Sequence, residues 1–352
     1  MPARRSIVCY LLLSRLRQPP ERIEESGALG CQEVSMKTNM AGEFMRSESS
    51  FRNWVTVDGR PGPSGEGGFQ AAPGRYHLYV SYACPWAHRT LIFRKLKGLE
   101  RAISVSVVHP LMPAESWVFG DYPGATPDHV HGFGKLHQLY EQSAPGFDGL
   151  VTVPVLYDKQ RHVIVNNESS EIIRMLNGAF DEWGRKAVDF CPEPLRDEID
   201  AINAVIYENV NNGVYRAGFA TTQSAYEAAF DRLFETLDDL DARLSAQRYL
   251  VGDSPTETDW RLFTTLVRFD AVYHGHFKCN RRRLVDYPNL WAYTRELYQV
   301  PGVSETVNMD HIKLHYYGSH HGINPTGIVP KGPELDFWAP HGRGDAGFQR
   351  CA

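Results

Sequence analysis

The sequence predicts an α/β domain followed by a domain built only of helices. Three observations lead to this interpretation. The chain has 352 residues, which corresponds to about two domains of roughly 100–200 residues each. Its first half alternates short strand and helix patterns, whereas beyond Pro194 apolar residues recur only at helical spacing. Hydrophobic residues make up 42% and charged residues 22% of the chain, which excludes a disordered or fibrous protein.

The α/β half should contain four short apolar strands and two helices. Tyr76, Leu78 and Val80 alternate with other residues as a half-buried strand would, and Pro85 stands just inside the helical pattern that follows. The strands are expected at residues 76–80, 103–109, 151–157 and 162–165, and the helices at about 85–97 and 168–176. The order is therefore β-α-β followed by β-β-α, with a polar, glycine-rich insertion between the two units.

The second half predicts a helical bundle. Its helices are expected at residues 195–211, 224–244, 259–272 and 289–298. Thr256 and Asp259 have the spacing of a capping box, which specifies the start of the third helix. The chain is therefore divided into an N-terminal extension (1–43), an α/β domain with an extended lead-in loop (44–185), a helical domain (186–321) and an extended tail (322–352).

The charge and the cysteines limit the possible classes of function. Lys and Arg (37) nearly balance Asp and Glu (42), so nucleic acid is not an expected partner. The apolar run 7–13 is far shorter than the ~20 residues of a membrane span. The six cysteines contain no CxxC pair, which favours reduced thiols in the cytoplasm over disulfides or a zinc site. The arginine-rich start of the chain leaves organelle targeting open.

The histidine groups and the glycine motif do not indicate a metal or nucleotide site. The histidine groups are His129 with His131, and His315 with His320 and His321. They lack carboxylate and cysteine partners at ligand spacing and are expected in surface loops. The one GxGxxG string, residues 342–347, follows no strand. We therefore expect neither a metal nor a nucleotide cofactor.

The segment Cys84–Ala87 carries the most specific chemical signal. Cys84 stands where a strand leads into a helix, and the free N–H groups and positive dipole end of a helix N-terminus favour an anion such as a thiolate. The pKa of such a thiol can fall from about 8.5 to roughly 3.5–7.5. A buried structural cysteine is the alternative. Ala87 occupies the place of the second thiol of a CxxC motif, so a mixed disulfide on Cys84 must be cleared by an outside thiol such as glutathione.

Two further segments fit a glutathione site. Pro154, in the run TVPV, marks a strand start or edge, where the backbone can pair with an extended peptide. Glu168 and Ser169 begin a helix, where N–H groups and a hydroxyl can hold a carboxylate while the Glu side chain meets an ammonium group. Taken alone, each segment is an ordinary strand start or helix cap.

In combination, CPWAHRT after a strand, TVPVL and NESSEII resemble the glutathione transferase superfamily. The chain is most similar to its Xi class, the glutathionyl-hydroquinone reductases, from about residue 44 to residue 342. The strings that carry this resemblance are FRNW, GGFQA, RYHLYVSYACPWAHRTLIFRKLKGLE, PGAT, VTVPVLYD, NNGVYRAGFAT, RYLVGD, RLFTTLVRFDAVY, HFKCN and INPTGI. The resemblance implies a thioredoxin-like first domain, an all-helical glutathione transferase second domain and a homodimer.

The resemblance also implies the site residues. Cys84 becomes the catalytic nucleophile, and Tyr215 and Tyr316 hold the quinol, with Tyr317 as a possible substitute. The residues assigned to glutathione are Trp117, Val153, Glu168 and Ser169. The family usually has an arginine just before VTVPVL where this chain has Leu150, so glutathione should bind more weakly here unless another cation replaces that arginine.

The implied reaction is the glutathione-dependent reduction of glutathionyl-hydroquinones. The Cys84 thiolate attacks the glutathionyl sulfur, and a second glutathione resolves the mixed disulfide to give oxidised glutathione. The first alternative is an Omega-like thiol transferase or dehydroascorbate reductase of the same fold. A non-catalytic protein-binding module of this fold is more distant, because such modules often lose the nucleophile, which is present here.

Overall fold

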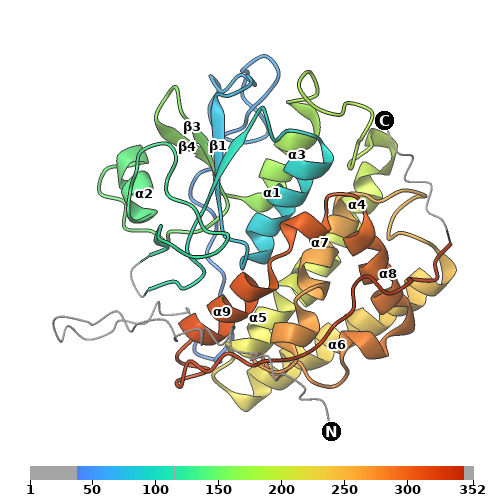
Figure 1. Ribbon diagram of the computed structural model, residues 1–352. Helices are drawn as coiled ribbons and strands as arrows, with labels where there is room; N and C mark the ends of the chain where they lie inside the picture. Colours follow the sequence, from blue (N-terminus) through green and yellow to red (C-terminus); the bar gives the residue numbers. More distant parts are fainter. Residues whose placement is uncertain (1–37, 114–115, 345–352) are drawn as a thin grey trace, which may run out of the picture. The chain divides into compact units, whose positions relative to one another are not determined.

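The computed structural model describes residues 38–113 and 116–344 (Figure 1). The expected N-terminal extension lies outside the described residues except for residues 38–43. The end of the expected tail (345–352), and with it part of the GxGxxG string, also lies outside them. Among the described helices, none is both long enough and apolar enough to cross a membrane.

Within the described residues, four strands form one mixed sheet in the first domain. They are β1 (Tyr76–Val80), β2 (Ser104–Val107), β3 (Val155–Asp158) and β4 (Val163–Asn166), in the order β2-β1-β3-β4. β2 runs parallel to β1 and β3 runs antiparallel to it. The helices α1 (Pro85–Leu96) and α3 (Ser169–Gly178) cover the face toward the helical domain, and α2 (His137–Ser143) lies on the other side (Figure 1). The predicted α/β domain is confirmed, but the sequence pattern does not indicate α2.

β1 is buried along its whole length, although its alternating pattern predicts a half-buried strand. The polar position His77 is satisfied by β2, because its two ring nitrogens lie 2.7 Å from Ser104 Oγ and 2.9 Å from Ser106 Oγ. Tyr79 donates its hydroxyl hydrogen to Asp128 at 2.8 Å. Both faces of β1 are therefore packed against other parts of the protein. The polar side chains among its alternating residues are hydrogen-bonded to protein groups instead of to water.

The second domain consists of helices, as predicted. The α-helices are α4 (Arg196–Ile206), α5 (Gly213–Gly218), α6 (Gln223–Ala246), α7 (Glu257–Leu266), α8 (Pro288–Gln299) and α9 (Met309–Ser319). Two π turns, η2 (Tyr207–Asn211) and η3 (Phe269–Tyr273), follow α4 and α7 in the segments where continuous helices are expected. Short 3₁₀ turns are η1 (Glu193–Leu195), η4 (Leu284–Asp286) and η5 (Ser304–Thr306). The sequence pattern does not indicate α5, because the stability of so short a helix comes mainly from tertiary packing. It does not indicate α9 either, because the apolar residues of this helix are only weakly gathered on one face.

α7 begins with the predicted capping box. Asp259 accepts a hydrogen bond from the Thr256 N–H at 2.7 Å, and the Thr256 side chain caps the helix in return. Asp259 also accepts from the Leu250 N–H at 3.0 Å and from the Tyr293 hydroxyl of α8 at 2.7 Å. The cap therefore also ties α7 to α8.

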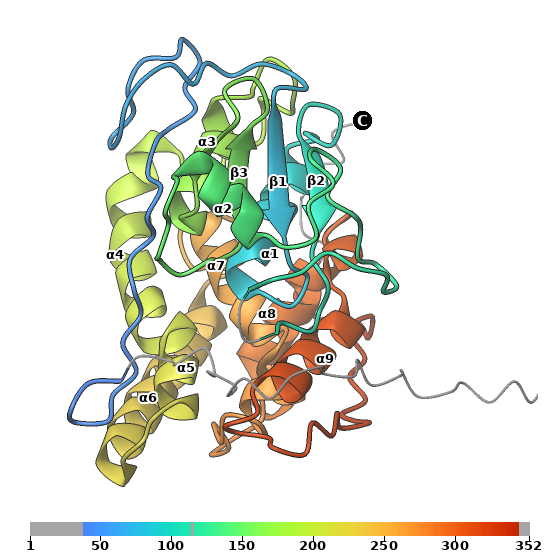
Figure 2. The same cartoon turned by 90° about the vertical axis from the view of Figure 1, so that its left-hand side faces the viewer.

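The lead-in segment and the tail follow the surfaces of the two domains. The lead-in runs from the region of α5 and α6 to the edge of the sheet (Figure 2). There the Phe51 N–H donates to the Asn167 side chain at 3.0 Å, and the Asn167 N–H donates to the Phe51 carbonyl at 3.1 Å. The tail lies along α8, where Phe337 packs against Trp291 and Tyr298.

The two domains meet along α1. Arg89 in α1 donates from Nη2 to Asn211 Oδ1 at 2.7 Å, and His88 Nε2 lies 2.8 Å from Thr306 Oγ1. Both α1 side chains are buried. These contacts place the N-terminal end of α1, and with it Cys84, against the helical domain.

Candidate active site

Cys84 lies at the junction of the two domains, as the N-cap residue of α1. The backbone N–H groups of Trp86 and Ala87 are directed at its sulfur. On the other side, Cys84 Sγ lies 3.4 Å from the carbonyl oxygen of Val153, next to the cis bond between Val153 and Pro154. The predicted position of this thiol at a helix N-terminus is confirmed, and the chain entering β3 faces it.

The pKa of Cys84 changes in the direction opposite to the expectation. Burial raises the pKa of this thiol above its usual value. The N–H groups of Trp86 and Ala87 lower the pKa, and so do the charges of Arg268 and Arg46, but they do not compensate for burial. The prediction of a lowered pKa is therefore wrong. The helix N-terminus acts as expected, but the loss of water around the sulfur has the larger effect.

Glu168 and Ser169 stand at the N-terminus of α3. Glu168 accepts hydrogen bonds from the N–H of Ser170 at 3.0 Å and from the hydroxyl of Ser49 at 3.0 Å. Burial raises the pKa of Glu168, but these hydrogen bonds and the charge of Arg89 outweigh it, so the pKa lies below its usual value. Ser169 Oγ lies 3.3 Å from Arg89 Nη1. The end of α3 thus presents an ionised carboxylate beside a hydroxyl.

Trp117 lies in the loop after β2 and contacts the helical domain. Its ring stacks on the ring of His315 in α9, with the centroids 4.8 Å apart. His315 in turn packs edge-on against Tyr316, with the centroids 5.4 Å apart. His315 is a buried residue of α9, so the expectation of a surface-loop histidine is wrong at this position. Trp117 is therefore linked to the tyrosine through one intervening ring.

Tyr215 and Tyr316 come together at the junction although 101 positions separate them in the sequence. Their hydroxyl oxygens are 2.5 Å apart, and the hydroxyl of Tyr273 in η3 lies 3.1 Å from that of Tyr316. Burial raises the pKa of all three phenols, so they stay protonated at neutral pH. Tyr317 instead donates to the carbonyl of Ala271 at 3.2 Å. Tyr316, not Tyr317, therefore belongs to this hydroxyl cluster.

Trp86 connects the thiol-bearing helix to the hydroxyl cluster. Its ring lies beside that of Tyr215, with the centroids 6.4 Å apart and the planes inclined by 30°. The guanidinium of Arg46, from the lead-in, lies 4.7 Å from the Trp86 ring centroid and 4.8 Å from that of Tyr215. Arg46 also donates from Nε to Asn212 Oδ1 at 2.6 Å, which holds it over the two rings.

Sequence reasoning misses several residues around the thiol. They are Arg46, Arg89, Arg268 and Tyr273. Arg46, Arg268 and Tyr273 reach the site through the packing of distant segments, so local spacing contains no signal for them. Arg89 lies in α1, five positions after Cys84, within the string CPWAHRT. Arg268 and Tyr273 do lie in the string RLFTTLVRFDAVY, one of those that carry the family resemblance.

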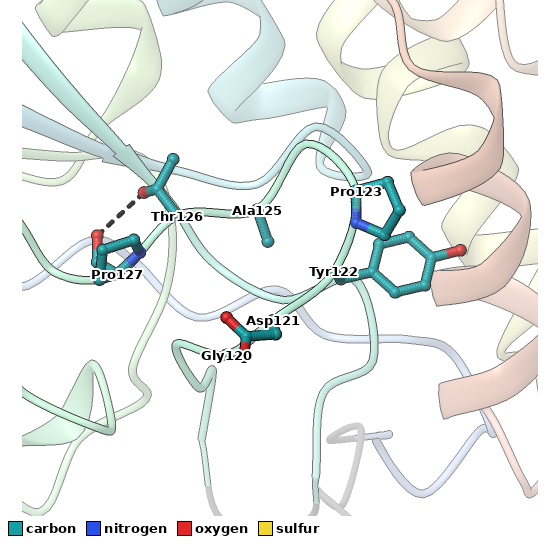
Figure 3. Close-up of a pocket in the computed structure, with 7 residues that line it drawn as sticks. All are labelled: Gly120, Asp121, Tyr122, Pro123, Ala125, Thr126 and Pro127. Carbon is teal, nitrogen blue, oxygen red and sulfur yellow. Dashed lines mark hydrogen bonds between the residues drawn. The ribbon is translucent and has the colours of Figure 1, made fainter. Parts of the chain in front are cut away.

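The loop 120–127 lines a cavity that does not include Cys84 or the hydroxyl cluster. Its volume is about 400 Å³, and it lies in the curve of the loop 120–127, where the Tyr122 ring turns toward α9 (Figure 3). Its described lining contains neither cysteine nor histidine. Across the described part of the chain, no cluster of three or more His, Cys, Asp or Glu side chains is arranged to hold a metal ion.

Leu150 is 53% exposed and adds no charge near β3.

Family models match both domains. The model described as glutathione S-transferase, N-terminal domain, matches residues 83–179, and the model described as glutathione S-transferase, C-terminal domain, matches residues 223–296. The first match includes Cys84 and the start of α3, and the second covers α6 and α7. The fold and the site thus define the class of the glutathione transferases.

Similar proteins narrow this class. The chain is 58% identical to the glutathionyl-hydroquinone reductase YqjG from Escherichia coli (strain K12), over 86% of this chain and 92% of that protein. It is 53% identical to the glutathionyl-hydroquinone reductase PcpF from Sphingobium chlorophenolicum, over 83% of this chain and 90% of that protein. The glutathione-bound structure of YqjG matches with a TM-score of 0.82, covering 84% of this chain and 96% of that one. The chain belongs to the glutathionyl-hydroquinone reductases, the Xi class of the glutathione transferases.

Proposed function

We propose that this protein reduces glutathionyl-hydroquinones to hydroquinones, with glutathione as co-substrate. One observation carries the proposal: the Cys84 thiol stands at the N-terminus of α1 next to Trp86, whose ring lies beside that of Tyr215, and the Tyr215 hydroxyl is paired with that of Tyr316. Position 87 is an alanine, so the thiol has no partner within the motif and depends on an external thiol. The phenol pair is suited to a substrate that carries ring hydroxyls.

Glutathione binding is assigned to Trp117, Val153, Glu168 and Ser169. The Glu168 carboxylate suits the ammonium of the γ-glutamyl group, and the Ser169 hydroxyl and the first N–H groups of α3 suit its carboxylate. The Val153 backbone faces Cys84 and suits pairing with the extended peptide, which brings the glutathione sulfur to the thiol. Trp117 supplies an aromatic wall on the side of α9.

The first chemical step is an attack by the Cys84 thiolate on the glutathionyl sulfur of the substrate. A sulfur–sulfur bond forms and the bond from that sulfur to the ring carbon breaks. The ring carbon keeps the electron pair and takes up a proton, so the ring is reduced and Cys84 carries a mixed disulfide. A second glutathione, as its thiolate, attacks this disulfide, releases oxidised glutathione and restores the Cys84 thiolate.

Tyr215 and Tyr316 are assigned to the quinol. A ring carbon is a poor leaving group from sulfur, and the keto tautomer of the quinol makes its departure easier. Reaching that tautomer requires protons to move between a ring oxygen and a ring carbon, which a positioned hydroxyl pair can assist. Because burial keeps both phenols protonated, they can donate hydrogen bonds to the quinol oxygen at neutral pH.

The test is mass spectrometry of the full chain after incubation with a glutathionyl-hydroquinone and no free glutathione. We expect one added glutathione, localised to Cys84 by peptide mapping, and the release of free hydroquinone. Cys84→Ser should lose the adduct and the activity while keeping its circular dichroism spectrum and melting temperature. An adduct on another cysteine would refute the assignment of the nucleophile. Higher activity with dehydroascorbate than with a glutathionyl-hydroquinone would favour the Omega-like alternative.

We further propose a homodimer that works in the reducing cytoplasm. The family resemblance supports the dimer, and the absence of CxxC pairs in the sequence supports reduced thiols. Light scattering on the purified chain tests the dimer, and a monomer mass at micromolar concentration would contradict it.

Limited proteolysis tests the proposed domain boundaries near residues 43, 185 and 321.

A further inference from the structure

Arg268 is a buried arginine that holds the backbone directly before Cys84. It follows α7 in the helical domain, and its side chain is fully buried. It donates from Nε to the carbonyl of Ala83 at 2.9 Å and from Nη2 to the carbonyl of Tyr82 at 2.8 Å. These are the two residues that precede Cys84, so one guanidinium clamps the turn that carries the thiol.

The remaining partners of Arg268 are neutral as well. Nη1 donates to the carbonyl of Thr264 at 2.7 Å and lies 3.0 Å from Nδ1 of His88. Burial lowers the pKa of His88 well below its usual value, so this imidazole is neutral and accepts the hydrogen bond. Within residues 38–113 and 116–344, all four hydrogen bonds of Arg268 are therefore with uncharged acceptors.

Arg268 and Arg89 are both buried arginines that have no carboxylate partner among the described residues. Among the described residues Arg268 forms no ion pair, whereas buried Lys97 pairs with Asp181 at 2.8 Å and Arg261 with Glu257 at 3.6 Å. Placing an uncompensated charge in the interior costs several kcal/mol. Such a charge is best explained where negative charge forms nearby during the reaction.

Cys84 is the group at which that negative charge forms. The charged groups that act on its ionisation are Arg268, from the helical domain, and Arg46, from the lead-in, and the neighbouring titratable group is Tyr215 of α5. Arg46 is exposed to water, which screens its charge. Arg268 is shielded from water, so its field reaches the thiolate with less screening.

We infer that Arg268 is a positioning residue that holds the Tyr82–Ala83 backbone and supplies the buried positive charge that stabilises the Cys84 thiolate. This inference rests on the proposed function, because it requires Cys84 to react as a thiolate. A purely structural clamp between the two domains would change folding stability but not the ionisation of the thiol. The two roles are therefore separated by a titration.

The experiment measures the rate of Cys84 alkylation by iodoacetamide against pH, in the full chain, with peptide mass spectrometry to follow this thiol alone. Arg268→Gln removes the charge and keeps hydrogen-bonding capacity, and Arg268→Lys keeps the charge. We expect the alkylation midpoint to move upward by about one pH unit in Arg268→Gln and by clearly less in Arg268→Lys. Equal midpoints in wild type and folded Arg268→Gln would overturn the inference.

A second pair of variants covers the case in which Arg268→Gln does not fold. His88→Asp places a carboxylate where the imidazole nitrogen meets the guanidinium, so the arginine stays in place while its charge is cancelled. His88→Asn is the neutral control of nearly the same shape. We expect the midpoint to rise in His88→Asp and to stay within about 0.3 pH units of wild type in His88→Asn. Because a carboxylate in contact with the guanidinium opposes its charge, no rise in His88→Asp would also overturn the inference.

Alkylation needs neither glutathione nor quinol. The shifts therefore report on Arg268 even if turnover of glutathionyl-hydroquinones were absent, and turnover could be present without the shifts. Failure of the inference and failure of the proposed function are thus distinguishable.

Discussion

Removing the hydroxyl of Tyr316 tests the assignment of the hydroxyl cluster most directly. In Tyr316→Phe the ring keeps its place among buried aromatic neighbours, but the hydroxyl bonds to Tyr215 at 2.5 Å and to Tyr273 at 3.1 Å are lost. At about 1 kcal/mol for each hydrogen bond, the variant should lose about 2 kcal/mol of unfolding free energy. The fold should survive this loss, because it removes no apolar contact.

The effect on catalysis should be larger than the effect on stability. Proton transfer by a positioned side chain contributes about 10²–10⁴-fold, and Tyr215 remains in the variant, so kcat should fall by about 100-fold, or about 2.7 kcal/mol in activation free energy. The KM for glutathione should change little, since Tyr316 is not assigned to that co-substrate. Steady-state kinetics with a glutathionyl-hydroquinone and urea unfolding measure the two quantities.

Tyr317→Phe is the matched control. Its hydroxyl bonds to a backbone carbonyl outside the cluster, so activity should stay within about twofold of wild type. Tyr316→Phe with normal kcat, or Tyr317→Phe with the large loss, would show that the hydroxyl cluster does not act on the quinol.

Three further predictions concern the thiol, the co-substrate and the fold. Because burial raises the pKa of Cys84, its alkylation rate should reach half its maximum above about pH 8.5, the midpoint of an ordinary thiol, and a plateau near pH 7 would contradict this. Leu150→Arg should lower the KM for glutathione by about twofold to fivefold, as expected for about 0.4–1 kcal/mol from one exposed charge, with Leu150→Ala as the uncharged control. Asp259→Ala leaves the buried Thr256 N–H and Tyr293 hydroxyl unpaired, so urea unfolding should show a loss of about 3 kcal/mol, and a loss below 1 kcal/mol would disprove the importance of this cap.

The features predicted correctly from the sequence are those that neighbouring residues determine. A strand, Cys84 and Pro85 in succession specify a thiol at a helix N-terminus, and Thr256 with Asp259 specify a capping box. In both cases the relevant hydrogen-bonding groups lie within one helical turn. The missed helices α2 and α5 are short, so their stability depends on distant segments, and the apolar residues of α9 are only weakly gathered on one face.

The pKa of Cys84 could not be predicted because it depends on distant packing. Spacing reveals the N–H groups of the helix, which lower the pKa, but not the burial of the sulfur, which raises it. Which of Tyr316 and Tyr317 places its hydroxyl in the cluster also depends on the packing of distant segments. Adjacent residues on a helix point in different directions, and only the position of α9 against η3 decides which hydroxyl meets Tyr273.

Cys84 lies where the two domains meet, so groups from both domains stand around the proposed nucleophile. The α/β domain supplies the thiol, the Val153 backbone and the start of α3, and these groups alone suit the binding of glutathione. The groups suited to a quinol, Tyr215 and Tyr316, come from the helical domain, as does Arg268, which holds the carbonyl of Ala83 directly before Cys84. Variation in the helical domain can therefore change the second substrate and the ionisation of Cys84 while the glutathione site stays the same. This division predicts that substitutions at the hydroxyl cluster alter kcat, whereas substitutions at the start of α3 alter the KM for glutathione.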